Sequence, residues 1–349
     1  MTPTLQALLG IDVPVIQAPM AGVQGSALAV AVSNAGGLGS LPCASLTAGA
    51  LATELAAIRA QTRRPFNVNF FCHAMPALDP ARDAAWRALL SPYYAEAAIG
   101  ADATPPATAR APFSHDVADV IAPFEPPVVS FHFGLPADDL LARVRAWGAK
   151  VLSSATTVEE ARWLEARGVD AIIAQGSEAG GHRGMFLPDD VATQAGTLAL
   201  VPQIADAVRV PVIAAGGIGD ARGAAAAMAL GASGVQAGTA YLLCPEATTS
   251  AVHRAALQSE AARTTAITNV FTGRPARSIV NRLVRELGPM NEAAPPFPLA
   301  AAALAPLRAH AEARGSGDFS NLWAGQNAPA CRAVAAAAVT SELAAGTRR

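Results

Sequence analysis

The 349-residue sequence lacks a strong net charge and has no long run of like charges. Its formal charge is −2 at pH 7, and its isoelectric point is near 6.3. Binding to nucleic acid or to acidic membrane lipids usually depends on a basic patch, and the sequence contains none. We therefore expect neither nucleic acid nor a membrane as a partner, and favour a small molecule.

Apolar segments of membrane-spanning length are also missing, although the mean hydropathy is +0.31. Gly, Ser, Gln and Thr interrupt the most apolar segment, 223–244, as is typical of a buried helix and strand. The first ten residues lack the basic residue and apolar core of a signal peptide. We predict a cytoplasmic protein.

Cysteine is scarce and scattered. Cys43, Cys72, Cys244 and Cys331 form no CxxC pair and no Cys/His cluster, which argues against a disulfide framework and a structural zinc site. The histidines lack ligand spacing and have no acidic cluster beside them, so no metal is expected. The chain contains no GxSxG motif, which leaves covalent hydrolysis unsupported.

Eight apolar segments are present, most of them rich in β-branched residues and followed by a segment of helical length. Such strands favour a parallel sheet covered by helices, and eight units in about 250 residues indicate a (β/α)8 TIM-like barrel of the α/β class. A doubly wound open sheet is the alternative. The segments are 13–20, 38–41, 65–71, 127–133, 150–155, 171–176, 210–217 and 234–243.

The barrel is expected to span residues 1–245, with an insertion, 72–126, after the third strand. Residues 246–349 are expected to form a helical C-terminal cap or side layer without a second independent core. Its helices are predicted at 245–262, 297–314 and 329–345. Both the insertion and the segment 177–196 follow a strand, so they should lie over the carboxyl-terminal mouth of the barrel, where active sites form.

Two consecutive strand ends carry glycines suited to a phosphate. AAGGIGD (214–220) ends one strand in a glycine pair, and QAGT (236–239) ends the next with Gly238 and Thr239. Glycine allows backbone N–H groups to approach an anion, helix N-termini add positive potential, and phosphates often bind at the last two strands of a barrel. The glycines of 214–220 do not match GxGxxG, so a dinucleotide fold is unsupported.

Other strand ends carry neutral polar side chains. The amides of Gln17, Asn69 and Gln175 are suited to the edge of a flat heteroaromatic ring, and Pro19 and Met20 to its apolar face. Flavin mononucleotide (FMN) satisfies both the ring and the phosphate requirements. The alternative is that each amide only satisfies backbone groups at the end of the barrel.

Among six histidines, His182 stands out because glycines flank it in QGSEAGGHRG (175–184). The backbone can therefore bring its imidazole over a bound ring, and we predict a catalytic role. His132, at the end of the fourth strand, and Ser177 are further candidates for contact with substrate. The others are expected to be structural or solvated, with exposed or loop positions for His73, His115 and His253 and a surface helix for His310.

The ordered motifs resemble those of class I nitronate monooxygenase, the flavoenzyme family once called 2-nitropropane dioxygenase. The similarity runs from about residue 8 to residue 290 and continues weakly into DFSNLWAGQ (318–326). It is carried by IQAPMAG, NAGGLGSL, FNVNFFCH, VSFHFG, AQGSEAGGHRG, VPVIAAGGIGD and GVQAGTAYLLCPEA. The resemblance implies an FMN-binding barrel without metal that oxidises alkyl nitronates with O2 to carbonyl compounds and nitrite.

The resemblance also implies roles for individual residues. His182 would be the catalytic group, acting on the proton of the carbon next to nitrogen. The flavin ring, its polar edge, the approach loop and the phosphate side would be contacted by Ala18, Pro19, Met20, Asn69, Gln175, Gly180, Gly181, Gly216, Gly217, Gln236, Ala237, Gly238 and Thr239.

The chain departs from the family pattern at the substrate mouth. Some members place tyrosines and a lysine there from the C-terminal region, whereas residues 295–307 contain neither, and Lys150 is the only lysine in the chain. The physiological substrate and the oligomeric state are not fixed by the sequence, and a homodimer is compatible with it.

Three other functions are alternatives to nitronate oxidation. An NAD(P)H-dependent FMN oxidoreductase of quinones or enoyl thioesters is the main alternative, because related barrels share the phosphate-binding pattern. A purine nucleotide dehydrogenase would need a cysteine after the sixth strand, and 177–196 contains none. A non-catalytic flavin- or phosphate-binding module would give no reason for His182.

Overall fold

The computed structural model describes residues 3–100 and 110–348. Within these ranges, a single sheet has the parallel strand order β1-β9-β8-β6-β5-β4-β3-β2. A parallel bridge between Ile16 and Leu38 joins the two outer strands and closes the barrel. The strands are β1 (Val15–Gln17), β2 (Gly39–Pro42), β3 (Phe66–Phe71), β4 (Val128–His132), β5 (Lys150–Ala155), β6 (Ala171–Gln175), β8 (Val212–Ala215) and β9 (Gly234–Ala237).

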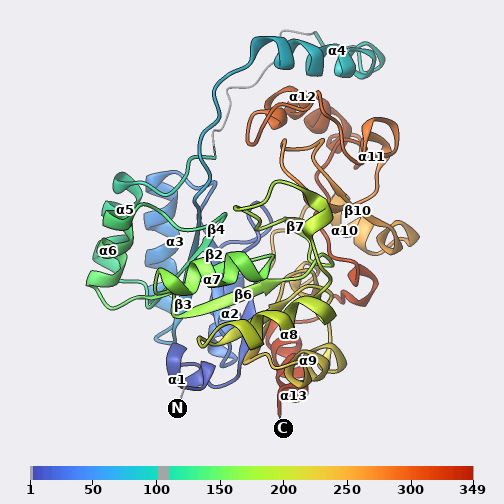
Figure 1. Ribbon diagram of the computed structural model, residues 1–349. Helices are drawn as coiled ribbons and strands as arrows, with labels where there is room; N and C mark the ends of the chain where they lie inside the picture. Colours follow the sequence, from blue (N-terminus) through green and yellow to red (C-terminus); the bar gives the residue numbers. More distant parts are fainter. Residues whose placement is uncertain (1–2, 101–109, 349) are drawn as a thin grey trace.

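The predicted barrel is confirmed, and each strand lies within or overlaps one of the eight apolar segments. Almost every strand residue is buried, because helices cover the outer face and side chains fill the interior. Figure 1 shows the helices around the barrel in the lower half of the molecule. They include α2 (Ser26–Asn34), α3 (Ala48–Gln61), α5 (His115–Ile121), α6 (Asp138–Ala146), α7 (Val158–Ala166), α8 (Thr197–Ala207) and α9 (Ala221–Ala229).

Local sequence explains how these helices begin and end. At α7 the Thr157 hydroxyl accepts a hydrogen bond from the Glu160 N–H at 3.2 Å, and Gly168 turns the chain away with φ +73°. At α9 the Asp220 carboxylate accepts from the N–H groups of Arg222 and Gly223, both at 3.0 Å. These capping bonds fix where the two helices begin, and Gly168 fixes where α7 ends.

The amino end of the barrel is filled by a short N-terminal helix, α1 (Leu5–Leu9). Leu5, Leu9 and Ile11 belong to one buried cluster with barrel residues such as Ile16 and Leu152. The barrel interior is therefore packed at this end, and the cavity described below lies at the other.

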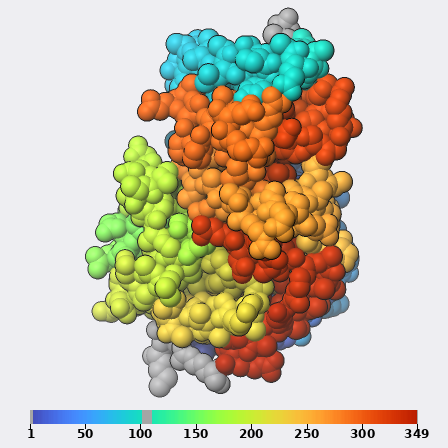
Figure 2. Space-filling view, turned by 90° about the vertical axis from the view of Figure 1, so that its right-hand side faces the viewer, coloured from blue at the N-terminus to red at the C-terminus, as the bar shows by residue number. Residues whose placement is uncertain are grey.

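The insertion after β3 and the C-terminal extension together form a cap over the carboxyl end of the barrel. Helix α4 (Pro80–Glu96) from the insertion packs on α12 (Ala300–Glu312) from the extension. In Figure 2 the insertion, in cyan, covers the orange segment of the extension at the top of the molecule. The indole of the fully buried Trp86 donates to the Ala300 carbonyl at 3.2 Å.

Hydrophobic contacts between the insertion and the extension hold the cap together. Trp86, Leu90 and Tyr93 of α4 form a hydrophobic cluster with residues of the extension, including Leu304 and Leu307, that is separate from the barrel clusters. Helix α11 (Arg282–Leu287) adds to it. This cluster joins two segments about 200 residues apart, so neither segment predicts it alone. The Pro/Ala-rich middle of the insertion, 102–112, falls largely outside the described residues.

A small antiparallel sheet, which the sequence did not predict, links the extension to the loop after β6. Its order is β10-β11-β7, with β10 (Thr265–Thr268), β11 (Ala276–Ile279) and β7 (Gly181–His182). His182 pairs with Ala276 and Gly181 with Arg277. The loop that carries His182 is thus one strand of a sheet.

The last helix, α13 (Ala336–Gly346), returns to the barrel. It packs against α9 and α2 and lies beside α9 near the C-terminus in Figure 1. The approach is close, since a side chain at Gly346 would overlap the backbone of Ala221. We therefore assign α13 to the layer of barrel helices, although the sequence analysis grouped it with the extension. Helix α10 (Ala251–Leu257) lies between β9 and β10 in the sequence. Among the described residues, no helix is long and apolar enough to cross a membrane.

Candidate active site

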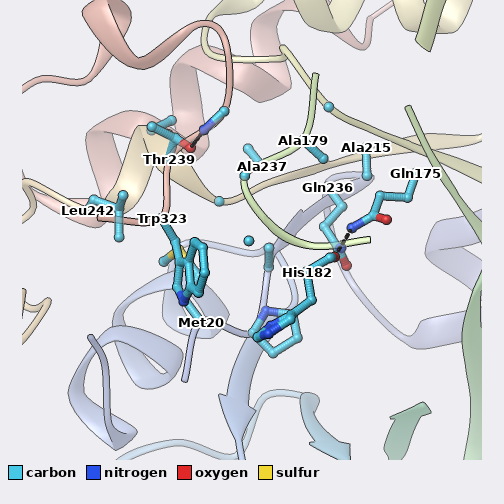
Figure 3. A pocket seen from close by; sticks show the side chains of 18 of the residues that line it. Met20, Gln175, Ala179, His182, Ala215, Gln236, Ala237, Thr239, Leu242 and Trp323 are labelled. Carbon is cyan, nitrogen blue, oxygen red and sulfur yellow. Dashed lines mark hydrogen bonds between the residues drawn. The ribbon is translucent and has the colours of Figure 1, made fainter. Parts of the chain in front are cut away.

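A large cavity lined by described residues opens at the carboxyl ends of the barrel strands (Figure 3). Strand ends form its floor, the loop after β6 forms one wall, and residues 323–330 of the extension form another. Of the residues singled out from the sequence, those that line it are Ala18, Pro19, Met20, Asn69, His132, Gln175, Gly180, Gly181, His182, Gly216, Gly217, Gln236, Ala237, Gly238 and Thr239.

Ser177, a candidate for contact with substrate, does not line the cavity. Its backbone N–H donates to the Ala195 carbonyl at 2.8 Å, and its own carbonyl accepts from Arg277 Nε at 2.7 Å. These bonds hold the residue at the base of the loop, away from the place where a substrate would lie.

The glycine turn after β8 has the features expected of an anion site. Gly216 and Gly217 have φ of +122° and +71°, a region that residues with a Cβ rarely adopt. Among the described residues, the backbone N–H groups of Gly217, Gly219 and Gly238 donate to no protein acceptor. No Asp or Glu lines the cavity in that part of the chain. These N–H groups are therefore available to a phosphate.

The N-terminus of α9 contributes less than the sequence suggested. The Asp220 carboxylate already accepts from two of its first N–H groups and also pairs with Arg222. A carboxylate at this position cancels much of the positive potential of the helix end. The phosphate-binding capacity therefore depends on the turns themselves.

The apolar floor comes from the turn after β1. The Ala18 N–H donates to the Ala237 carbonyl at 2.8 Å, which ties this turn to β9. A Cβ at Gly238 would lie 3.4 Å from both Ala18 and Met20. Glycine at 238 thus keeps the floor open between the two strand ends, where a flat ring could lie against Pro19 and Met20.

The amides divide into two groups. Gln17 does not line the cavity, and its fully buried side chain bonds to Gln24 and to the Ser40 N–H, so the purely structural alternative holds there. Gln236 differs, because its Oε1 is buried in the cavity wall without a hydrogen-bond partner in the described residues. An unpaired buried acceptor is costly, so it points to a donor on a bound molecule.

Gln175 and Asn69 both make hydrogen bonds within the protein, but they differ in what they leave for a ligand. Gln175 Nε2 donates to the His182 carbonyl at 3.0 Å, drawn in Figure 3, and its Oε1 accepts from the Gly184 N–H at 2.7 Å. Asn69 Nδ2 donates to Ser130 Oγ at 2.9 Å, while its Oδ1 makes no bond in the described chain. Gln175 therefore shapes the His182 loop, and Asn69 has an acceptor free for a ligand.

The imidazole of His182 forms part of the cavity wall and is only 8% exposed. Its Nε2 lies 2.9 Å from Thr272 Oγ1, whereas its Nδ1 has no partner in the described chain. His132 Nε2 lies 3.1 Å from the His182 carbonyl, and His132 Nδ1 lies 3.0 Å from Ser154 Oγ. His132 thus orients the backbone of His182, and Nδ1 of His182 is free to react.

Aromatic rings surround this imidazole. The centroids of Phe297 and Trp323 lie 5.2 and 5.3 Å from that of His182, and Phe71 lies 6.1 Å away. Figure 3 shows the Trp323 indole and the His182 ring next to each other over the floor of the cavity. These rings give the imidazole apolar surroundings on this side of the cavity.

Burial and neighbouring positive charges keep His182 neutral. Burial lowers its pKa well below the ordinary value of 6.5, and the charge of Arg110 lowers it further. Burial also lowers the pKa of His132 to about 4. Both imidazoles are therefore unprotonated at neutral pH, and a neutral imidazole can accept a proton.

The loop that presents His182 is rigidly anchored. The fully buried Arg183 guanidinium donates to the carbonyls of Gln175 and Gly176 at 2.6 and 2.7 Å. The Glu178 carboxylate accepts from the Thr197 N–H at 2.8 Å and from its hydroxyl at 2.8 Å. Neither charged side chain lines the cavity. Their role is to fix the loop.

Several residues at the site were missed or misplaced by sequence reasoning. His253 was expected in an exposed or loop position, yet it lies in a helix, is only 4% exposed and lines the cavity. His73 does lie in a loop, as expected, but it is buried. Phe71 could have been found, because it lies two residues after Asn69 on the same face of β3. Thr272, Phe297 and Trp323 carried no local signal. Only the fold of the extension brings them to His182.

A family model described as nitronate monooxygenase matches residues 2–345. A nitronate monooxygenase of Paraburkholderia phytofirmans is 45% identical over 346 residues, which cover 97% of this chain and 93% of that protein. A nitroalkane oxidase of Streptomyces ansochromogenes has a similar structure, with a TM-score of 0.86, 38% identity and coverage of 98% and 97% of the two chains. FabK of Thermotoga maritima is more distant, with a TM-score of 0.71, 27% identity and coverage of 98% and 95%.

Proposed function

The chain belongs to the nitronate monooxygenase family, a family of flavoenzymes, and on that premise we propose that it oxidises alkyl nitronates, using FMN and O2, to carbonyl compounds and nitrite. The observation that carries the proposal is His182, whose imidazole lines a cavity with an apolar floor and a turn rich in unpaired N–H groups, and whose Nδ1 has no hydrogen-bond partner in the described chain. A cytoplasmic location, expected from the sequence, is part of the proposal.

The residues of the cavity fit the chemistry of FMN. The phosphate would be held by the N–H groups of the turns at 216–219 and 238–239, because Gly217, Gly219 and Gly238 have no acceptor for their N–H groups within 3–100 and 110–348. The ring would lie on Ala18, Pro19 and Met20, next to the unpaired Gln236 Oε1. Asn69, Gln175, Gly180, Gly181 and Ala237 complete the proposed cofactor site. When bound, the flavin supplies the electron transfer between substrate and oxygen.

His182 would handle the substrate proton. With a neutral nitroalkane as substrate, Nδ1 accepts the proton of the carbon next to nitrogen, and the C–H electron pair moves into the C=N bond of the nitronate. Nδ1 carries its lone pair only when Nε2 carries the hydrogen, and in that tautomer Nε2–H donates to Thr272 Oγ1. Thr272 is therefore proposed as a positioning residue. His132 would act in the same way, through the His182 carbonyl.

The proposal can be tested by mixing the purified flavoprotein without oxygen, in one cuvette with propane-2-nitronate and in another with NADH or NADPH. We expect the flavin absorption spectrum to change promptly with the nitronate and not with the nicotinamides. In air, nitrite should form in step with nitronate consumption. The likeness to FabK keeps a nicotinamide-dependent reductase as the second candidate, and a flavin that responds only to NADH or NADPH would favour it.

A further inference from the structure

Arg110 lies at the mouth of the cavity, where the insertion after β3 returns to the barrel. The Phe113 N–H donates to the Phe71 carbonyl at 2.8 Å, so this part of the insertion is fixed to the end of β3. Arg110 lines the main cavity together with His182 and Trp323. It also lines a smaller side cavity with Thr272 and with Arg308 of α12. The residue thus stands between the reactive imidazole and the cap.

The guanidinium of Arg110 has no hydrogen bond and no ion pair with any described residue. Other arginines near the site are occupied, since Arg183 donates to Gln175, Arg277 to Ser177 and Arg274 to the Met185 carbonyl. A guanidinium has five N–H donors, and leaving them unpaired in a largely enclosed place is costly. Arg110 is therefore short of an acceptor.

The charges around Arg110 make an anion the fitting acceptor. No carboxylate lines either cavity in the described chain. Burial and the charge of Arg308 lower the pKa of Arg110, and Arg110 in turn lowers the pKa of His182. The electrostatic potential around Arg110 is thus positive, and no carboxylate among the described residues that line the two cavities offsets it. A planar pair of oxygen atoms matches the guanidinium fork best.

We propose that Arg110 binds the two oxygen atoms of the nitronate group, holds the carbon end of the substrate toward His182, and so sets the preference for the anionic nitronate over the neutral nitroalkane. This inference rests on the proposed function. It assigns to the insertion, which lies outside the barrel, a direct part in substrate recognition.

The test is calorimetric binding to the FMN-loaded protein of isobutyrate, which has nearly the shape and charge of propane-2-nitronate, and of isobutyramide, its neutral counterpart. In Arg110→Gln the dissociation constant for isobutyrate should rise about 10- to 100-fold, as for loss of a charged hydrogen bond, with isobutyramide unchanged. Arg110→Lys keeps the charge but not the forked pair of donors. Its dissociation constant for isobutyrate should therefore lie between those of the wild type and Arg110→Gln. Arg285→Gln is the matched control, because Arg285 is an exposed arginine of the cap that lines neither cavity, and it should bind isobutyrate as the wild type does.

Kinetics give a second readout. In Arg110→Gln the KM for propane-2-nitronate should rise by a similar factor with little change in kcat, and the KM for 2-nitropropane should stay the same. Equal losses for the charged and neutral probes, or unchanged isobutyrate binding, would overturn the inference; Arg110→Lys provides the comparison if Arg110→Gln does not fold. A wild-type protein that binds isobutyrate through Arg110 yet does not oxidise propane-2-nitronate would refute the proposed function and leave the anion site standing.

Discussion

At His182, burial and charge act in the same direction. The imidazole is enclosed by aromatic rings, and the groups that face it are Arg110, Arg274, His132 and His73, all of which lower its pKa. The neutral form, which accepts a proton, therefore persists below pH 6.5 and is lost only as the pH falls through the lowered pKa.

This predicts the pH dependence of the reaction. For a neutral nitroalkane, kcat/KM should stay constant as the pH falls from 8 through 6.5, and the acid limb should lie well below 6.5. The profile is measured from initial rates in the wild type. His182→Asn serves as the control, and it should lose most turnover of the neutral nitroalkane while keeping FMN, because asparagine cannot accept the proton. An acid limb centred at 6.5 or above would contradict this account.

The site residues that could be predicted from the sequence are those that belong to a recognisable local motif. The glycine pair at 216–217, the AlaProMet turn and His182 in its glycine-rich segment all line the cavity. Thr272 could not be found in this way, because 90 positions separate it from His182 and no pattern marks it. The contacts of the Gln175 side chain with His182 and Gly184 could not be predicted either, because they depend on the course of the backbone through the loop after β6.

At the scale of elements, the next prediction concerns the turn after β8. Gly217→Ala places a Cβ on a residue with φ +71°, which costs about 1–2 kcal/mol and shifts the turn. We expect the FMN dissociation constant to rise at least about tenfold, since a misdirected N–H loses a charged hydrogen bond. FMN affinity is measured by fluorescence titration of the apoprotein.

Gly148→Ala is the matched control for Gly217→Ala. Gly148 also has a positive φ, +84°, but it lies far from the cavity lining, and a Cβ there would meet nothing within 4 Å. This variant should lose a similar amount of stability and bind FMN normally. Equal loss of FMN affinity in both variants would mean that the turn at 217 has no special part in binding.

The eight barrel strands were predictable, whereas β7, β10 and β11 were not. Each barrel strand is buried on both faces and therefore reads as a continuous apolar segment. The three other strands have two to four residues and contain Thr, Arg and His, so they show no hydrophobic pattern of their own. They exist because the loop after β6 and the extension meet over the barrel.

At the scale of the whole molecule, buried histidines couple stability to pH. His132 and His253 each have a pKa of about 4, and both return to about 6.5 when the chain unfolds. Between these values the unfolded chain binds more protons, so the free energy of unfolding falls as the pH drops. Each of these histidines should lower the free energy of unfolding by about 2 kcal/mol between pH 7 and pH 5.

Urea unfolding at pH 7 and pH 5, with the same excess of FMN, measures this loss. The comparison with His253→Gln isolates one contribution, because that variant removes one titrating group and should lose about 2 kcal/mol less between the two pH values. A free energy of unfolding that is equal at pH 5 and pH 7 would show that the histidines are not buried as described.

The wall of the cavity includes residues from Ala18 to Ala330, and the helix that completes the barrel follows them at 336–346. During synthesis on the ribosome, the first strands emerge long before the segment 323–330 that closes the site. The ligand cavity cannot be complete until nearly the whole chain has been translated. Cofactor insertion is therefore a late event in the biogenesis of this protein, and chains truncated before residue 323 would lack one wall of the site.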